Sequence, residues 1–161
     1  MSPEDIISII ETTLCGVVPK ESWGETSLFY NPGMILPNGV YFCTLKCKNG
    51  NNDRASALDR AGVFRVAIGL HPETYMRLFG PKPTRPAKGG VVLTDCNYDF
   101  TTLDELMPHP IYAWMGWAQI LCPSSAQFER IFPLIEEAHQ VAVEKFKRKT
   151  VNYSNIVERS E

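Results

Sequence analysis

The sequence has little net charge and no long hydrophobic run, and both absences narrow the class of protein. Its 161 residues carry 16 basic and 18 acidic side chains, a formal net charge of −2. This balance gives no electrostatic footprint for nucleic acid or an anionic membrane, although it leaves room for a local patch. No segment approaches the roughly 20 apolar residues of a membrane-spanning helix. The N-terminus, Met1–Asp5, lacks the features of a signal peptide, so we expect a cytoplasmic protein without membrane association.

Motifs of metal, cofactor and nucleophile chemistry are also missing. The three histidines lack the spacing of metal ligands, and the five cysteines are an odd number scattered through apolar segments. There is no glycine-rich dinucleotide turn and no G-x-S-x-G nucleophile elbow. We therefore predict no metal site and no cofactor, and cysteines that act as small buried hydrophobic residues.

The composition is typical of a protein that buries one core. Hydrophobic residues make up 44% of the chain and charged residues 21%. A length of 161 residues fits one domain and leaves little room for two. We predict a single domain over residues 1–150, followed by a polar, frayed C-terminal tail over residues 151–161.

Two terminal helices are well marked. Ser2 can cap the first helix, Pro3 suits its first position, and an apolar stripe follows as far as Leu14. The longest helix is predicted over about residues 126–149, capped by Ser124 or Ser125. Pro133 lies inside it and is expected to kink or restart it, because proline has no N–H to donate. His139 is assigned to the surface of this helix.

Short segments rich in β-branched and aromatic residues lie between these helices. We predict strands at residues 26–30, 40–47, 62–70 and 116–122, and a further short strand at 91–94. A short helix is expected at residues 71–78, a helical turn at 103–107, and an irregular loop at the proline-rich stretch 81–90. Because the loops between the early strands are short, the fold class is α+β, an antiparallel sheet flanked by the two terminal helices.

The densest polar cluster is the stretch Ser56–Arg60, followed by Arg65 in an otherwise apolar strand. Asp59 can neutralise an arginine, and a paired guanidinium can bind a carboxylate or phosphate in a fork. The cluster therefore has two interpretations. It is either an anion site at the mouth of the sheet, formed by Asp59, Arg60 and Arg65, or an ion pair that anchors the loop before the strand.

A second candidate is His109, which Pro108 and Pro110 hold in an extended backbone. A fixed histidine near Tyr112 can act as a general base or hold a ligand. The alternative is a rigid turn in which the ring is hydrogen-bonded to the backbone. The aromatic residues present the same choice between a pocket wall and the core. Those that could line a pocket are Trp23, Phe29, Tyr30, Tyr41, Phe42, Tyr112, Trp114 and Trp117, and the ones selected as ligand-binding candidates are Trp23, Tyr112 and Trp117.

Three stretches together resemble a known family. They are WGET at residues 23–26, SALDRAGVFR at 56–65, and HPIY at 109–112 followed by GW at 116–117. With the long helix after Pro123, they resemble a family of small uncharacterised bacterial proteins classed only as a domain of unknown function. The resemblance implies a family but no activity. The last strand and Glu137–His139 are also loosely similar to the MmcQ/YjbR-like proteins, for which DNA binding has been suggested.

The leading functional hypothesis is a small intracellular binding domain for an anionic or aromatic small molecule, or for a protein partner. The candidate ligand-binding residues are Asp59, Arg60, Arg65, His109, Tyr112, Trp23 and Trp117. One alternative is a hydrolase or transferase that uses His109 as its general base. The other is a nucleic-acid-binding domain, which requires the basic residues of 82–88 and 145–148 to form one face.

Overall fold

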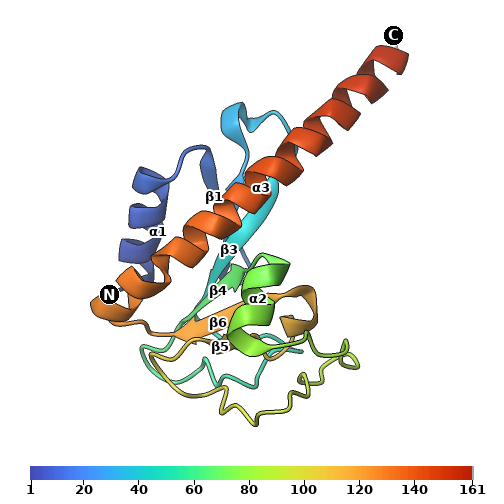
Figure 1. Cartoon of the computed structure of the whole chain (residues 1–161). Coiled ribbons are helices and arrows are strands. Elements are labelled where there is room, and N and C mark those ends of the chain that lie inside the picture. Colours follow the sequence, from blue (N-terminus) through green and yellow to red (C-terminus); the bar gives the residue numbers. More distant parts are fainter. Residues whose placement is uncertain (161) are drawn as a thin grey trace.

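A computed structural model describes residues 1–160 and confirms the predicted α+β fold (Figure 1). Residues 1–160 contain three helices, six strands and two short 3-10 turns, η1 (Pro32–Met34) and η2 (Ala113–Met115). In chain order they are α1 (Pro3–Thr13), β1 (Val17–Ser22), β2 (Glu25–Tyr30), β3 (Val40–Lys46), β4 (Arg65–Gly69), α2 (Pro72–Phe79), β5 (Met107–Pro108), β6 (Trp117–Leu121) and α3 (Ser125–Ser160).

The six strands form one sheet in the order β1-β2-β3-β4-β6-β5, and every neighbouring pair is antiparallel. The predicted sheet is therefore correct, but two edge strands were missed. β1 contains Pro19, which weakens any strand pattern and is tolerated because β1 is an edge strand. β5 has only two residues, too few for an alternating pattern.

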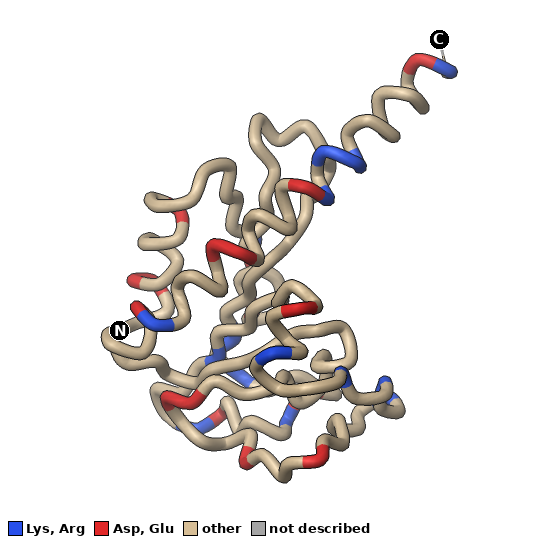
Figure 2. Tube along the Cα trace, in the orientation of Figure 1, with Lys and Arg blue, Asp and Glu red and all other residues tan. Residues whose placement is uncertain are grey.

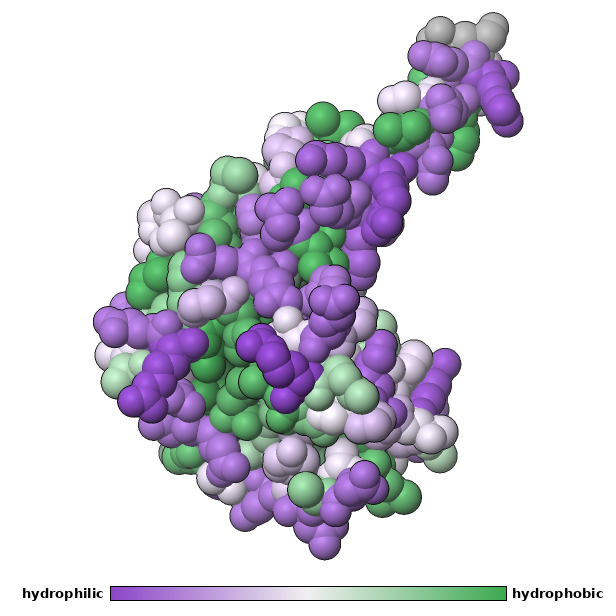
Figure 3. Space-filling model, viewed as in Figure 1, coloured by the Kyte–Doolittle hydropathy of each residue, from purple (hydrophilic) through white to green (hydrophobic). Residues whose placement is uncertain are grey.

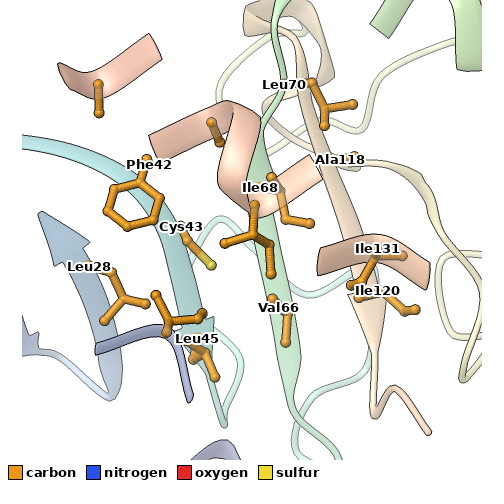
Figure 4. Close-up of a cluster of buried hydrophobic side chains, with 14 of the residues drawn as sticks. Leu28, Phe42, Cys43, Leu45, Val66, Ile68, Leu70, Ala118, Ile120 and Ile131 are labelled. Atoms are coloured by element: carbon orange, nitrogen blue, oxygen red, sulfur yellow. The ribbon is translucent and has the colours of Figure 1, made fainter. Parts of the chain in front are cut away.

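The hydrophobic core lies between one face of the sheet and the helices. Figure 1 shows α3 crossing in front of the sheet with α1 beside it. Alternate residues of β2, β3, β4 and β6 point toward α3, including Leu28, Leu45, Ile68 and Ile120 (Figure 4). These side chains are 2% exposed or less, so this face of the sheet is sealed. The opposite face is free to form a site.

One irregularity in β3 changes which side chains reach the second face. Leu28 pairs with Cys43 but Phe29 pairs with Tyr41, so Phe42 is an extra residue in β3. Both Phe42 and Cys43 are buried in the core, where strict alternation would allow only one (Figure 4). This β-bulge turns Tyr41 to the second face.

The helix ends follow the predicted capping chemistry. The Ser2 hydroxyl accepts from the Asp5 N–H at 3.1 Å, and Asp5 accepts from the Ser2 N–H at 2.9 Å. This is a capping box, with Pro3 in the first turn. His71 caps α2 by accepting from the Glu73 N–H at 3.2 Å.

The long C-terminal helix differs from the prediction in two ways, at its C-terminal end and at His139. It continues to Ser160, so residues 151–160 are helical rather than frayed, and their end stands clear of the rest of the molecule (Figure 3). Pro133 lies within the helix without ending it. His139 is not on the surface: it is 7% exposed, and its Nε2 lies 2.8 Å from the Cys15 carbonyl oxygen.

Three other predictions were wrong. Residues 91–94 form no strand, and residues 103–107 form no helical turn. Asp104 has a φ of 61°, which breaks a helix, and its carboxylate accepts from the Ser124 N–H at 2.7 Å. Among the cysteines, only Cys43 is buried. Cys122 is half-buried, and the exposed thiols are Cys15, Cys47 and Cys96.

The irregular stretch at residues 81–90 is confirmed. Figure 1 shows that the loops between β3 and β4 and between α2 and β6 gather at the end of the molecule away from the projecting part of α3. Within residues 1–160, no helix combines the length and the hydrophobicity that crossing a membrane requires.

Candidate functional site

The second face of the sheet carries its side chains in three rows that run across the strands. The strand register aligns Glu25 with Lys46 and Lys46 with Arg65, which makes a charged row. Two residues further along β4, a middle row contains small and polar side chains: Ser27, Thr44, Ala67 and Gln119. Two residues further again, an aromatic row contains Phe29, Tyr41 and Trp117, with Gly69 between the last two.

The charged row centres on a buried ion pair between Arg65 and Asp53. Arg65 Nη1 donates to Asp53 Oδ1 at 2.9 Å, and Nη2 donates to Oδ2, so the pair is a two-pronged fork. Lys46 Nζ lies 3.2 Å from the same Oδ2 and 3.7 Å from Glu25. Burial favours a raised pKa for the Asp53 carboxyl, but the hydrogen bonds and charge of Arg65 outweigh it and hold that pKa well below its usual value.

Arg65 keeps donors that nothing in the described chain accepts. A guanidinium has five N–H groups, and Arg65 uses two of them on Asp53. Its Nε is buried and has no hydrogen-bond partner among residues 1–160. Arg65 itself is only 2% exposed. An unmatched donor on a buried cation is costly, and Arg65 also lines the cavity described below, so its guanidinium is a candidate for ligand contact.

His109 is held in one tautomer by the backbone. Its Nδ1 accepts from the N–H groups of Ile111 and Tyr112, both at 3.1 Å. The proton of the neutral ring therefore sits on Nε2, for which no partner lies within hydrogen-bond distance in the described chain. Burial, followed by the charge of Arg65, lowers the pKa of His109 well below 6.5. The ring is thus a neutral hydrogen-bond donor at pH 7.

The aromatic row depends on a glycine. The rings of Tyr41 and Trp117 stack with centroids 5.3 Å apart, and Phe29 lies 5.8 Å from Tyr41. Between these strands, a Cβ on Gly69 would lie 3.0 Å from the Trp117 ring. Gly69 therefore lets the indole lie across β4 and reach Tyr41, as a side chain there would push the ring away.

These rows form the floor of a cavity of about 770 Å³, which is the size of a small-molecule site. Its walls come from two loops. One is residues 50–53, and the other contains Arg85, whose guanidinium carbon lies 4.6 Å from the Trp114 ring centroid. Tyr112 and His109 complete the wall beside β6.

The cavity is more positive than the chain as a whole. Its lining has four basic side chains, Lys46, Arg65, Arg85 and Lys88, and two acidic ones, Glu25 and Asp53. That is an excess of two positive charges, while the whole chain has a formal net charge of −2. The local field therefore favours an anionic occupant.

The structure divides the residues that the sequence singled out. Arg65, His109, Tyr112 and Trp117 line the cavity together. Trp23 does not: it is 92% exposed in the turn between β1 and β2.

Asp59 and Arg60 are also separate from Arg65, and border a smaller cavity of about 390 Å³. The idea that Asp59 neutralises an arginine was wrong, because it accepts from the Asn49 N–H at 2.9 Å instead. Arg60 donates to three backbone carbonyls, those of Ser56, Ala57 and Thr101. These contacts hold the loop in place, as the structural interpretation of this stretch predicted, although through carbonyls rather than through an ion pair.

Sequence reasoning missed the residues that organise the site, above all Asp53 and Lys46. Asp53 stands in a stretch that is typical of a loop, twelve positions before its partner Arg65. Lys46 is two residues after Thr44 at the end of β3, and that alternation places both on one face of a strand. Tyr41 was among the aromatic residues considered for a pocket, but alternation alone places it on the wrong face, because the bulge at Phe42 reverses the alternation.

The low pKa of His109 predicts that the protein loses stability in mild acid. Below pH 6.5 the unfolded chain binds a proton that the native state does not, so the free energy of unfolding decreases as the pH falls. One such histidine accounts for a loss of about 1 kcal/mol between pH 7.5 and 5.5. His109→Asn, whose amide oxygen can replace Nδ1 as acceptor, should remove this loss in urea unfolding at the two pH values.

A matched control is His71→Asn, which changes a histidine at the start of α2 that also accepts a backbone N–H. This variant should keep the loss of stability between the two pH values. If the wild-type protein and His109→Asn show the same pH dependence, His109 is not held neutral in the native state.

The fold and the site together define an α+β protein whose antiparallel sheet has helices on one face and an open, positively charged cavity on the other. The chain belongs to the Family of unknown function (DUF6194), whose family model matches residues 1–151. This confirms the expected resemblance to a domain of unknown function over most of the chain. No curated protein and no solved structure matches the chain. The bacterial origin and the similarity to MmcQ/YjbR-like proteins gain no support from these comparisons.

Proposed function

We propose that this protein binds a small anionic molecule in the cavity, with Arg65 as the principal donor and Lys46 as the adjacent cation. The observation that carries the proposal is the guanidinium of Arg65, which is 2% exposed and uses only two of its N–H groups on Asp53. A carboxylate or phosphate oxygen is the acceptor that such a group binds best.

A comparison with Arg60 argues against a purely structural role for Arg65. Arg60 anchors a loop, and it donates to three backbone carbonyls. Arg65 donates to no carbonyl of residues 1–160, although it is more deeply buried and has greater need of partners. Asp53 fixes its orientation and offsets its charge, and Lys46 restores a positive charge beside the pair. This arrangement is what a preorganised anion site requires.

His109 supports binding better than general-base catalysis. Its Nδ1 lone pair is already used by two backbone N–H groups, and Nε2 carries the proton. Within residues 1–160, no carboxylate lies within 4.0 Å of the His109 ring nitrogens, so none can orient the ring or stabilise its protonated form. The hydrolase or transferase hypothesis needs such a partner. As an Nε2–H donor facing an anion, His109 needs none.

The nucleic-acid hypothesis requires one continuous basic face. Figure 2 shows that the basic residues near the end of α3 lie far from those of the 81–90 loop, at opposite ends of the molecule. The positive charge is concentrated in a cavity of about 770 Å³ rather than along a surface, which favours a small ligand.

The proposal is tested with a carboxylate and its uncharged amide. In an NMR titration, 5-cyclohexylpentanoate should bind and shift the signals of residues that line the cavity, while 5-cyclohexylpentanamide should bind at least about tenfold more weakly. Lys46→Met should weaken carboxylate binding by a similar factor.

The matched control is Lys20→Met, because Lys20 lies on β1 outside the cavity and contacts Pro37 and Asn38. This variant should leave the affinity unchanged. Equal binding of the acid and the amide, or no binding of either, contradicts the proposed function.

A further inference from the structure

The charged and aromatic rows lie at a fixed separation on the cavity floor. Arg65 belongs to the charged row, and Gly69, which lies beneath Trp117, belongs to the aromatic row. Gly69 is four positions after Arg65 along the extended strand β4, which is a distance of about 13 Å at roughly 3.3 Å per residue. A ligand that contacts both rows must therefore be elongated and must lie along the strands.

The middle row leaves room for such a molecule. Its members over the centre of the cavity are Ser27, Thr44 and Ala67, which are all small. Larger side chains stand on both sides, Lys46 and Arg65 in one direction and the aromatic rings in the other. The floor is therefore lowest in the middle, where a linking segment would cross it.

The aromatic row is not part of the hydrophobic core. The core lies on the helix-covered face of the sheet, whereas Trp117 and Tyr41 line the cavity on the other face. Tyr41 is 45% exposed and Tyr112, beside it, is 47% exposed. Three strands contribute rings to this row, and a bulge and a glycine are needed to bring them together. Aromatic rings that are exposed or half-buried on one wall of a cavity are suited to stacking on a flat ligand group.

From this arrangement we infer that the anion bound by this protein is an elongated aromatic one. Its ring stacks on Trp117 and Tyr41, and its carboxylate or phosphate reaches Arg65 and Lys46 across the small middle row. The inference rests on the proposed function, because it uses the same cavity and adds the aromatic end of the ligand.

The test compares two pairs of acids on the wild-type protein by NMR titration. In the long pair, 5-phenylpentanoate should bind roughly two- to tenfold more tightly than 5-cyclohexylpentanoate, which is the range expected for one aromatic contact. In the short pair, phenylacetate and cyclohexylacetate should bind equally, because a ring so close to its carboxylate cannot reach the aromatic row.

The outcomes separate this inference from the proposed function. If no acid binds, the proposed function fails. If all the acids bind but the long pair shows no preference for the phenyl ring, anion binding stands and the aromatic inference is overturned. An equal phenyl preference in both pairs overturns the elongated geometry, since it would place the ring beside Arg65.

Variants locate the ring contact. Trp117→Leu should abolish the phenyl preference of the long pair, and the matched control Trp23→Leu, which changes an exposed tryptophan outside the cavity, should retain it. Tyr41→Leu is the second variant, because a residue that is 45% exposed can be replaced with less risk to folding. Persistence of the full preference in both cavity variants overturns the inference.

Discussion

Replacement of Asp53 by alanine should lower the free energy of unfolding by about 3–5 kcal/mol, because it leaves the buried Arg65 guanidinium without its counterion. Arg65 is 2% exposed and has no other ionic partner in the described part of the chain. Removal of one member of a buried pair costs more than the pair contributes, since the remaining charge stays desolvated. Urea unfolding at pH 7 measures the effect.

The matched control is Glu25→Ala, which removes the other carboxylate that contacts Lys46. Glu25 is 31% exposed and its contact is 3.7 Å long, so we expect a loss of less than about 1 kcal/mol. The double variant Asp53→Ala/Arg65→Met should recover most of the stability lost in Asp53→Ala. If the two single alanine variants lose the same stability, the Arg65–Asp53 pair is not the buried element described above.

The Arg65–Asp53 pair should also make stability depend on pH, at pH values lower than those at which His109 acts. The pKa of Asp53 is held well below its ordinary value of 3.8, so the unfolded chain binds a proton near that pH while the native carboxyl stays charged. The stabilisation is complete above about pH 4 and is lost as the pH falls toward the native pKa. The variant Asp53→Ala/Arg65→Met should therefore lose less stability than the wild-type protein between pH 4 and pH 2.5.

The second large effect is expected for Gly39→Ala, which should lower the free energy of unfolding by about 3 kcal/mol or more. Gly39 precedes β3 with a φ of 86°, and an alanine in this left-handed conformation is strained by roughly 1–2 kcal/mol. A Cβ there would also lie 2.5 Å from the Tyr30 carbonyl oxygen, so the backbone must move. The movement would disturb Asn31, a buried residue whose side chain makes two hydrogen bonds to the Leu36 backbone. Urea unfolding of the variant measures the loss.

Gly62→Ala separates the two causes. Gly62 has a φ of 73°, but a Cβ there would meet nothing within 4 Å. This variant should therefore lose only the conformational part, about 1–2 kcal/mol. An equal loss in the two variants would show that the close approach of Gly39 to Tyr30 does not constrain the loop.

Much of the fold could be predicted because its causes are local. The capping box of Ser2 and Asp5, the cap at His71, and the stop at Gly80 act within one helical turn. The predicted centres of β2, β3, β4 and β6 were correct, since each has the β-branched and aromatic residues of a strand. The α+β class and the antiparallel sheet followed from these elements and from the short loops.

The site depended on contacts between distant parts of the chain. Arg65 and His109 could be named from the sequence as unusual residues, a charge in an apolar strand and a ring between prolines. That Asp53 rather than Asp59 pairs with Arg65 follows from how the loop after β3 folds back over the sheet. No local property of the two aspartates distinguishes them.

The sequence by itself determined where most helices and strands form, because capping, turn formation and alternation are properties of neighbouring residues. Only the tertiary structure decided that Tyr41 joins Trp117 over Gly69, that His139 is buried against Cys15, and that Arg65 and His109 share one cavity. Each of these depends on strand register, on a bulge, or on burial between elements far apart in the chain. Register, bulges and burial are fixed only when the sheet and helices pack together, so they cannot be deduced from any single segment of the sequence.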